Sequence, residues 1–145
     1  MSELVIMSFA ISRGEPPEAN LVFDMRFLRN PHWQEELRPL SGLDRAVGEY
    51  ISGDETYGEA LARIEAALRT LLPLYQADGK ALVRVAFGCT GGRHRSVHVA
   101  EEVAERLRAA GFSPRLDHRD LAAPLRVGTE RSAGGGPQGS GADGC

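Results

Sequence analysis

Several features are scarce in this chain of 145 residues, and each scarcity excludes a class of protein. No apolar run approaches the roughly 18 residues that a membrane-spanning helix needs. The first residues, Met1-Ser2-Glu3, lack the basic start of a signal peptide. These absences predict a soluble protein of the cytoplasm that has no membrane partner.

Cysteine is also scarce, with only Cys89 and Cys145. Cys89 lies in a glycine-rich loop and Cys145 is the last residue, so a structural disulfide is not expected. Neither a CxxC pair nor the HExxH spacing of histidines occurs, which argues against a metal site. The P-loop pattern GxxxxGK[ST] is missing too, so we expect no hydrolysis of ATP or GTP and no cofactor.

Lysine is reduced to Lys80, and all other basic residues are arginines. Seventeen basic against twenty acidic residues give a net charge of −3, which offers no global attraction for a polyanion. Binding of nucleic acid would therefore need a local patch of basic residues. Aromatic side chains that could stack on unpaired bases are scarce in the region of the basic residues named next. A modest local excess of basic residues comes from Arg84, Arg93, Arg95, Arg106, Arg108, Arg115 and Arg119.

The residues that are present predict a single α/β domain. Apolar runs at 4–9, 21–28, 81–87 and 113–118 predict strands, and residues 30–42 predict an ordered but irregular loop. Apolar spacing predicts helices at 43–51, from about Thr56 to 78 with a capping box at Thr56-x-x-Glu59, and from about His94 to 110. This alternation favours a small, mostly parallel sheet flanked by helices. Residues 1–126 are expected to form the domain, and 127–145, rich in Gly, Ser and Pro, a disordered tail.

The segment from Gly88 to Ser96 joins a predicted strand to a predicted helix. Such a turn gathers backbone N–H groups and a helix N-terminus around one point, which suits the binding of a phosphate. We expect Arg95, at an open helix start, to be the main charge, and His94 to add a donor whose charge depends on pH. The simpler alternative is a tight turn with Arg95 on the surface, and His98 is either near the site or a solvated surface residue. The candidate ligand-binding residues of this segment are Thr90, Gly91, Gly92, His94, Arg95 and Ser96.

The same segment fits the CxxGxxR[ST] pattern of cysteine phosphatases, with Cys89 and Arg95 as catalytic residues. In those enzymes a thiolate attacks phosphorus and the arginine grips the oxygens. A phosphatase also needs a general acid. The candidates Asp24, Asp117 and Asp120 have no distinctive flanking signature, and Gly88 stands where this class usually has histidine.

Three separated motifs in the same order closely resemble the C-terminal domain of the RNase adaptor protein RapZ family. They are residues 22–33 (VFDMRFLRNPHW), 37–44 (LRPLSGLD) and 88–97 (GCTGGRHRSV), within a similarity that spans about residues 5–121. The resemblance implies a fold like a phosphofructokinase subdomain and binding of an amino-sugar phosphate such as glucosamine 6-phosphate. In enterobacterial members it also implies binding of small regulatory RNAs, assisted by a basic C-terminal cluster that this chain does not have.

The resemblance assigns the ligand pocket to residues of two separate motifs. It implies that Asp24 and Arg26 form a strand-end pair that faces the loop, where the residues alone also allow a simple surface ion pair. Family members usually carry an N-terminal kinase-like domain with a P-loop, and no such pattern occurs here. The pocket residues that the resemblance implies are Arg26, Thr90, Gly91, Gly92, His94 and Arg95.

Two functions are therefore expected as alternatives. The first is a RapZ C-terminal-like binding module, not an enzyme, that senses a phosphorylated small molecule. It would act as a regulatory adaptor for a small regulatory RNA or a protein partner, including a separately encoded kinase-like domain. The second is a cysteine-dependent phosphatase, which a chromogenic phosphoester assay with a Cys89→Ser control would reveal. The sequence leaves the identity of the ligand and the oligomeric state open.

Overall fold

The computed structural model describes residues 2–121. The described chain forms a four-stranded sheet, all of whose pairings are parallel, with the strand order β2-β3-β1-β4. The expectation of a mostly parallel α/β sheet is confirmed, while the expected tail at 127–145 lies outside the described residues. In chain order the elements are β1 (Glu3–Ala10), η1 (Ile11–Arg13), β2 (Leu21–Asp24), η2 (Pro31–Trp33), α1 (Arg45–Ser52), α2 (Tyr57–Ala77), β3 (Leu82–Cys89), α3 (Arg95–Ala109) and β4 (Pro114–His118).

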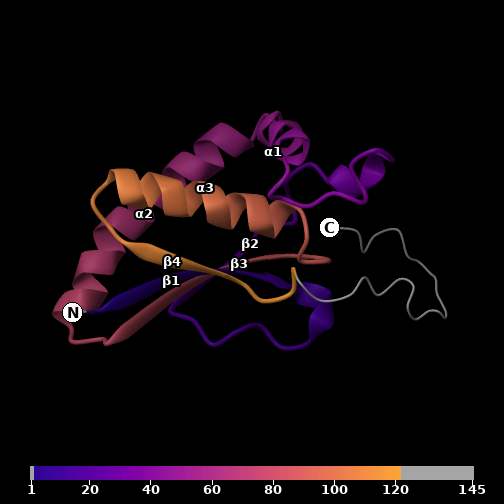
Figure 1. Ribbon diagram of the computed structural model, residues 1–145. Helices are drawn as coiled ribbons and strands as arrows, with labels where there is room; N and C mark the ends of the chain where they lie inside the picture. The colour runs from indigo at the N-terminus through magenta and orange to yellow at the C-terminus, as the bar shows by residue number, and fades with distance from the viewer. Residues whose placement is uncertain (1, 122–145) are drawn as a thin grey trace.

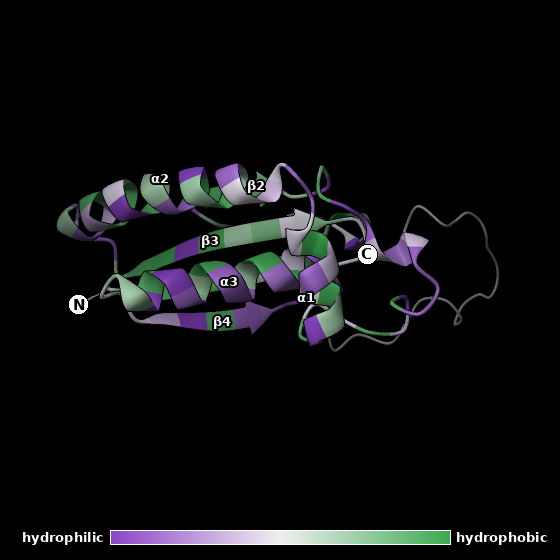
Figure 2. Cartoon of the chain, turned by 90° about the horizontal axis from the view of Figure 1, so that it is seen from above, coloured by the Kyte–Doolittle hydropathy of each residue, from purple (hydrophilic) through white to green (hydrophobic). Residues whose placement is uncertain are grey.

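All three α-helices cover the same face of the sheet (Figure 1). The crossovers from β2 to β3 and from β3 to β4 run in the same direction across the sheet, so right-handed connections place their helices on one side. Seen from above, α3 runs between β3 and β4, over the central strand β1, and it contacts all three strands (Figure 2). The main core lies in this layer and includes Ile6, Leu61, Phe87, Val103 and Leu107, all of which are fully buried. Burial of each such side chain contributes about 1.5–3 kcal/mol.

The opposite face of the sheet has a smaller core. Val5, Met7, Phe9 and Ala86 form a second buried cluster there, with Ile11 and Ala19 packed against it. The connection from β1 to β2, residues 11–20, runs along this side (Figure 1). Among the described residues, no helix combines the length and the apolar character that a bilayer crossing requires.

Strand β2 is shorter than the sequence predicts. It ends at Asp24, whereas the apolar run suggested a strand over residues 21–28. The Met25 N–H still donates to the Gly88 carbonyl at 2.8 Å, but the Leu28 N–H then turns back to the Met25 carbonyl. The Asp24 carboxylate accepts the Arg26 N–H at 3.0 Å and stabilises this turn, a local arrangement typical of aspartate.

The start of α2 also differs from the prediction. Thr56 precedes the helix, but its hydroxyl donates to Asp54 Oδ1 at 2.6 Å and makes no capping bond to the first turn. The predicted capping box with Glu59 is therefore wrong. The Asp54 side chain is the acceptor here, and its hydrogen bonds with Thr56 hold the pKa of its carboxyl below the usual range.

Candidate functional site

The candidate loop lies at the carboxyl end of β3, in the middle of the sheet. Strand β3 extends through Gly88 and Cys89, which pair with Phe9 and Ala10 of β1, so only residues 90–94 separate it from α3. We call residues 90–94 the glycine loop. Gly92 adopts φ +72°, a left-handed conformation that side chains rarely take. The carboxyl end of a parallel sheet is the usual position of ligand sites in such folds.

The glycine loop retains a set of backbone donors. None of the hydrogen bonds among the described residues has as its donor the backbone N–H of Thr90, Gly91, Gly92, Arg93 or His94. Helix α3 begins directly afterwards at Arg95, and the first N–H groups of a helix carry a partial positive charge. The loop thus adds free N–H groups to a helix N-terminus, which is an arrangement suited to an anion.

Arg95 is buried, with 4% of its surface exposed. Its Nη1 donates to the carbonyl oxygen of Arg26 at 2.6 Å and to that of Leu28 at 3.1 Å. The prediction of an open helix start is therefore wrong at this residue. The guanidinium donates to two carbonyl oxygens of the turn after β2. It therefore holds this turn against the start of α3.

His94 is also buried, with 2% of its surface exposed. Its Nε2 lies 2.7 Å from the Leu40 carbonyl, which can only accept, so Nε2 carries the proton. Nδ1 is buried and has no hydrogen-bond partner among the described residues. Burial is the main cause that lowers the pKa of His94 to about 4. The expected pH-dependent donor is therefore a neutral imidazole at physiological pH, and its charge does not change near neutrality.

The glycine loop is fastened to the irregular segment at 30–42 by further contacts. Arg93 Nη2 donates to the carbonyls of Pro39 and Leu40 at 3.3 Å each, and the Gly42 N–H donates to the Arg93 carbonyl at 2.7 Å. A Cβ atom at Gly42 would overlap the His94 carbonyl oxygen. Two motifs that are separate in the sequence are thus packed together at the glycine loop.

Cys89 and Ser96 lie beneath the loop and are both fully buried. The Cys89 thiol is 3.2 Å from Ser96 Oγ, and it accepts the Ser96 N–H at 3.3 Å. Ser96 therefore contacts the cysteine at the end of β3. This places its hydroxyl at the base of the loop, and not on the exposed side where a ligand would enter.

Arg26 and Asp24 form a close ion pair at the end of β2. Arg26 Nη2 is 2.7 Å from Asp24 Oδ2 and Nε is 2.9 Å from Oδ1, and both side chains are about half exposed. The hydrogen bond from Arg26 is the main cause that holds the pKa of Asp24 below its usual range, with a smaller contribution from Arg95. The pair thus lies at the end of β2, where Asp24 is paired with Gly88 of β3, and its two charges are directed at each other, as in the surface ion pair that the residues alone also allowed.

The other expected candidates take part in contacts elsewhere. His98 is half-buried and its Nε2 is 2.8 Å from the Tyr57 hydroxyl, so it is not a solvated surface residue. Burial lowers the pKa of His98 and raises that of Tyr57 to about 12. In the part of the chain that the structure describes, no three His, Cys, Asp or Glu side chains gather as a metal site would require.

The end of β1 also belongs to the site, although sequence reasoning did not identify it. Ser12 donates to the Thr90 carbonyl with both its N–H, at 3.2 Å, and its hydroxyl, at 2.7 Å. The Gly92 position has no room for a Cβ atom, which would lie 2.8 Å from Ala10 Cβ. The sequence signal for this contact is slight, because only the parallel pairing of β1 with β3 brings the two segments together.

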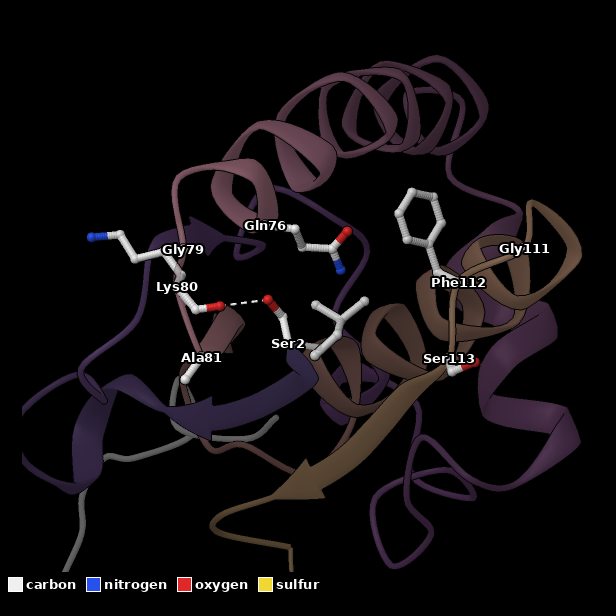
Figure 3. Close-up of a pocket in the computed structure, with 9 residues that line it drawn as sticks. Ser2, Gln76, Gly79, Lys80, Ala81, Gly111, Phe112 and Ser113 are labelled. Carbon is white, nitrogen blue, oxygen red and sulfur yellow. Dashed lines mark hydrogen bonds between the residues drawn. The ribbon is translucent and has the colours of Figure 1, made fainter.

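A hollow of about 600 Å³ lies at the opposite edge of the sheet, where β1 and β3 begin. Its lining includes Leu4, Gln76 and Phe112, and none of the expected site residues (Figure 3). The Ser2 hydroxyl donates to the Lys80 carbonyl at this edge, while the Lys80 side chain extends away from the hollow (Figure 3). The hollow is therefore separate from the glycine loop.

Comparison with known proteins supports the motif resemblance across the whole described domain. The family model described as "RapZ C-terminal domain" matches residues 2–122. A "Nucleotide-binding protein" of Rhizorhabdus wittichii is 63% identical over 118 residues, which cover 81% of this chain and 38% of that protein. One of the same name from Novosphingobium aromaticivorans is 62% identical over 118 residues, covering 81% of this chain and 39% of that protein. The chain thus spans about two fifths of the length of these relatives. With that match, and with the three motifs packed around one loop, the chain belongs to the RapZ C-terminal domain family.

Proposed function

We propose that this domain binds a phosphorylated small molecule at the glycine loop and that the ligand is an amino-sugar phosphate such as glucosamine 6-phosphate. The observation that carries the proposal is the set of backbone N–H groups at residues 90–94, which have no acceptor among the described residues, next to the start of α3. A dianionic phosphate supplies the acceptors that these donors lack. Membership of the RapZ C-terminal domain family favours the amino sugar.

In this proposal the candidate residues divide into two groups. Thr90, Gly91 and Gly92 offer backbone donors, and the half-exposed Arg26 offers a guanidinium that a phosphate would share with Asp24. The side chains of His94, Arg95 and Ser96 are buried behind the backbone of the loop. Arg95 contributes its charge from there, where low solvent exposure leaves the field on a bound anion less screened. The structure thus favours recognition mainly by main-chain groups.

The test compares ligands that differ by one group. Glucosamine 6-phosphate should raise the melting temperature and bind in calorimetry, whereas glucosamine should do neither, because a ligand stabilises only the state that it binds. Glucose 6-phosphate and inorganic phosphate measure what the amine and the sugar add. Mononucleotides belong in the same series, since the relatives are named nucleotide-binding proteins. If none of these phosphates shifts the melting temperature at millimolar concentration, the proposal is wrong.

A cysteine-dependent phosphatase is the second candidate, and one contact favours it. The Ser96 N–H donates to the Cys89 sulfur, and the thiol donates to Ser96 Oγ. If the thiol lost its proton, the Ser96 hydroxyl could donate as well, and such donors stabilise a thiolate. Against it, Cys89 is fully buried, and Arg95 donates to the Arg26 and Leu28 carbonyls. Hydrolysis of a chromogenic phosphoester that disappears in Cys89→Ser would establish this activity.

We further propose the adaptor role, with a small regulatory RNA or a protein as partner, on family membership alone. The expected arginine patch gives it little support, because most of those side chains are paired. Arg106 contacts Glu102, Arg115 contacts Glu3 and Arg119 contacts Asp120. Titration of a small regulatory RNA at 50 and 200 mM salt tests the RNA part, since binding through phosphates weakens steeply with salt.

A further inference from the structure

The three residues His118, Arg119 and Asp120 connect the end of β4 to the end of β1. Asp120 Oδ2 accepts the Ala10 N–H at 2.7 Å and lies 3.0 Å from Arg119 Nη2. The Arg119 N–H donates to the Ser8 carbonyl at 3.0 Å. The Asp120 side chain is 12% exposed, so its carboxylate is held mainly by these protein donors.

Arg119 adds contacts that fix the position of this carboxylate. Its Nη1 donates to the Glu15 carbonyl at 2.8 Å, and its guanidinium lies over the Phe9 ring, 5.5 Å from the centroid. His118 bonds on both sides, with Nδ1 2.7 Å from Ser8 Oγ and Nε2 2.7 Å from Glu101 Oε2 on α3. The side chains of Ser8, His118 and Glu101 are bonded in the order of a serine, histidine and carboxylate triad. Ser8 is fully buried, so the arrangement is structural.

Ala10 in turn lies directly against the glycine loop. A Cβ atom at Gly92 would be 2.8 Å from Ala10 Cβ and 2.9 Å from the Ala10 nitrogen. That same nitrogen donates its hydrogen bond to Asp120 Oδ2. Two residues later in the chain, Ser12 donates twice to Thr90 of the loop. The end of β1 is thus the surface on which the glycine loop rests, and Asp120 holds it from the other side.

We propose that Asp120 is a positioning residue for the glycine loop, acting through its hydrogen bond to the Ala10 backbone. The proposal deepens the proposed function, because it names a residue outside the loop that sets the positions of the loop's backbone donors. If the Ala10 N–H loses its acceptor, the end of β1 is free to shift, and the close contact between Ala10 and Gly92 transmits the shift to the loop.

The first experiment needs no ligand and uses the reactivity of Cys89, which lies under the loop. On a Cys145→Ser background Cys89 is the single cysteine, and a thiol reagent reaches it only when the loop opens or the protein unfolds. Asp120→Ala should label at least ten-fold faster than the parent, and the rate should respond weakly to low denaturant, as local opening does. Asp120→Asn retains an oxygen that can accept the Ala10 N–H and should stay within three-fold of the parent.

Two more variants separate positioning from a loss of general stability. Glu3→Gln weakens the contact between Arg115 and Glu3, 2.7 Å apart, which joins the same two strands at their other end, and should leave labelling unchanged. Asp120→Glu keeps the charge near Arg119 but displaces it from Ala10, so it should label about three-fold faster or more, and it serves if Asp120→Ala does not fold. Labelling of Asp120→Ala and Asp120→Glu at the parent's rate, or equal acceleration by Glu3→Gln, would overturn the proposal.

The second experiment measures binding of glucosamine 6-phosphate by calorimetry. Asp120→Ala should weaken binding about ten-fold, Asp120→Asn should restore most of the affinity, and Glu3→Gln should bind like the parent. If the parent itself binds none of the phosphates tested, the proposed function fails while the labelling experiment still decides the role of Asp120. If the parent binds and Asp120→Ala binds equally well, the positioning role is wrong and the proposed function stands.

Discussion

The buried imidazole of His94 makes stability depend on pH. Its pKa is about 4 in the folded protein, below the ordinary histidine value of 6.5, so the unfolded chain binds more protons between these two values. The free energy of unfolding should therefore fall as the pH drops from about 6.5 towards 4, by up to about 3 kcal/mol. Urea unfolding at pH 7.5 and 4.5 measures this fall, and His94→Gln should reduce it. An equal fall in the variant would show that other groups cause it, His98 first among them.

Arg95 is expected to stabilise the fold, since it is buried and donates to two main-chain carbonyls. Arg95→Ala leaves those carbonyls of Arg26 and Leu28 without this donor, and should lower the free energy of unfolding by about 2–4 kcal/mol. Arg95→Lys should cost less, because an ammonium can still donate to one of them. Arg45→Ala is the control, as it removes an exposed pair with Glu49, and its urea midpoint should not change. A melting temperature of Arg95→Ala equal to the parent's would contradict this expectation.

At the scale of elements, the two ends of α3 offer a matched pair of glycines with positive φ. Gly92 before the helix has φ +72° and close contacts with Ala10, whereas Gly111 after it has φ +99° and open space around its Cβ position. Gly111→Ala should cost about 1 kcal/mol of stability and leave ligand affinity unchanged. Gly92→Ala should cost more and weaken binding of glucosamine 6-phosphate at least ten-fold, because the loop must move away from β1. Equal effects of the two variants on affinity would argue against a precise loop position.

At the scale of the whole molecule, we expect no turnover of ATP or GTP. The printed sequence has no GxxxxGK[ST] pattern, and its glycine loop has no lysine to reach a γ-phosphate. Phosphate release in the presence of magnesium measures this directly. The outcome that would refute the expectation is magnesium-dependent release that copurifies with the domain and disappears in Gly92→Ala.

The sequence predicted those parts of the fold that depend on local patterns. Apolar runs and helical spacing located the strands, the helices and the loop between β3 and α3, because these signals involve neighbouring residues. The burial of Arg95 and His94 was not predicted, because the acceptors at Arg26 and Leu28 lie in a turn that the apolar run predicted as strand, and the acceptor at Leu40 lies in the irregular segment. The acceptor role of Asp120 was missed for a similar reason, since its partner Ala10 is 110 positions away.

The central place of β1 in the sheet affects the order in which the molecule assembles. The ribosome makes this strand before both of its neighbours, β3 and β4, and the contact between Ser8 and His118 spans 110 positions. Contacts between residues so far apart in the sequence slow folding. In the nascent chain β1 stays unpaired until β3 and β4 have been made. The end of β1, against which the glycine loop packs, has all its contacts only when β4 and Asp120 have emerged from the ribosome. A truncated product of translation would therefore contain the loop sequence without being competent to bind.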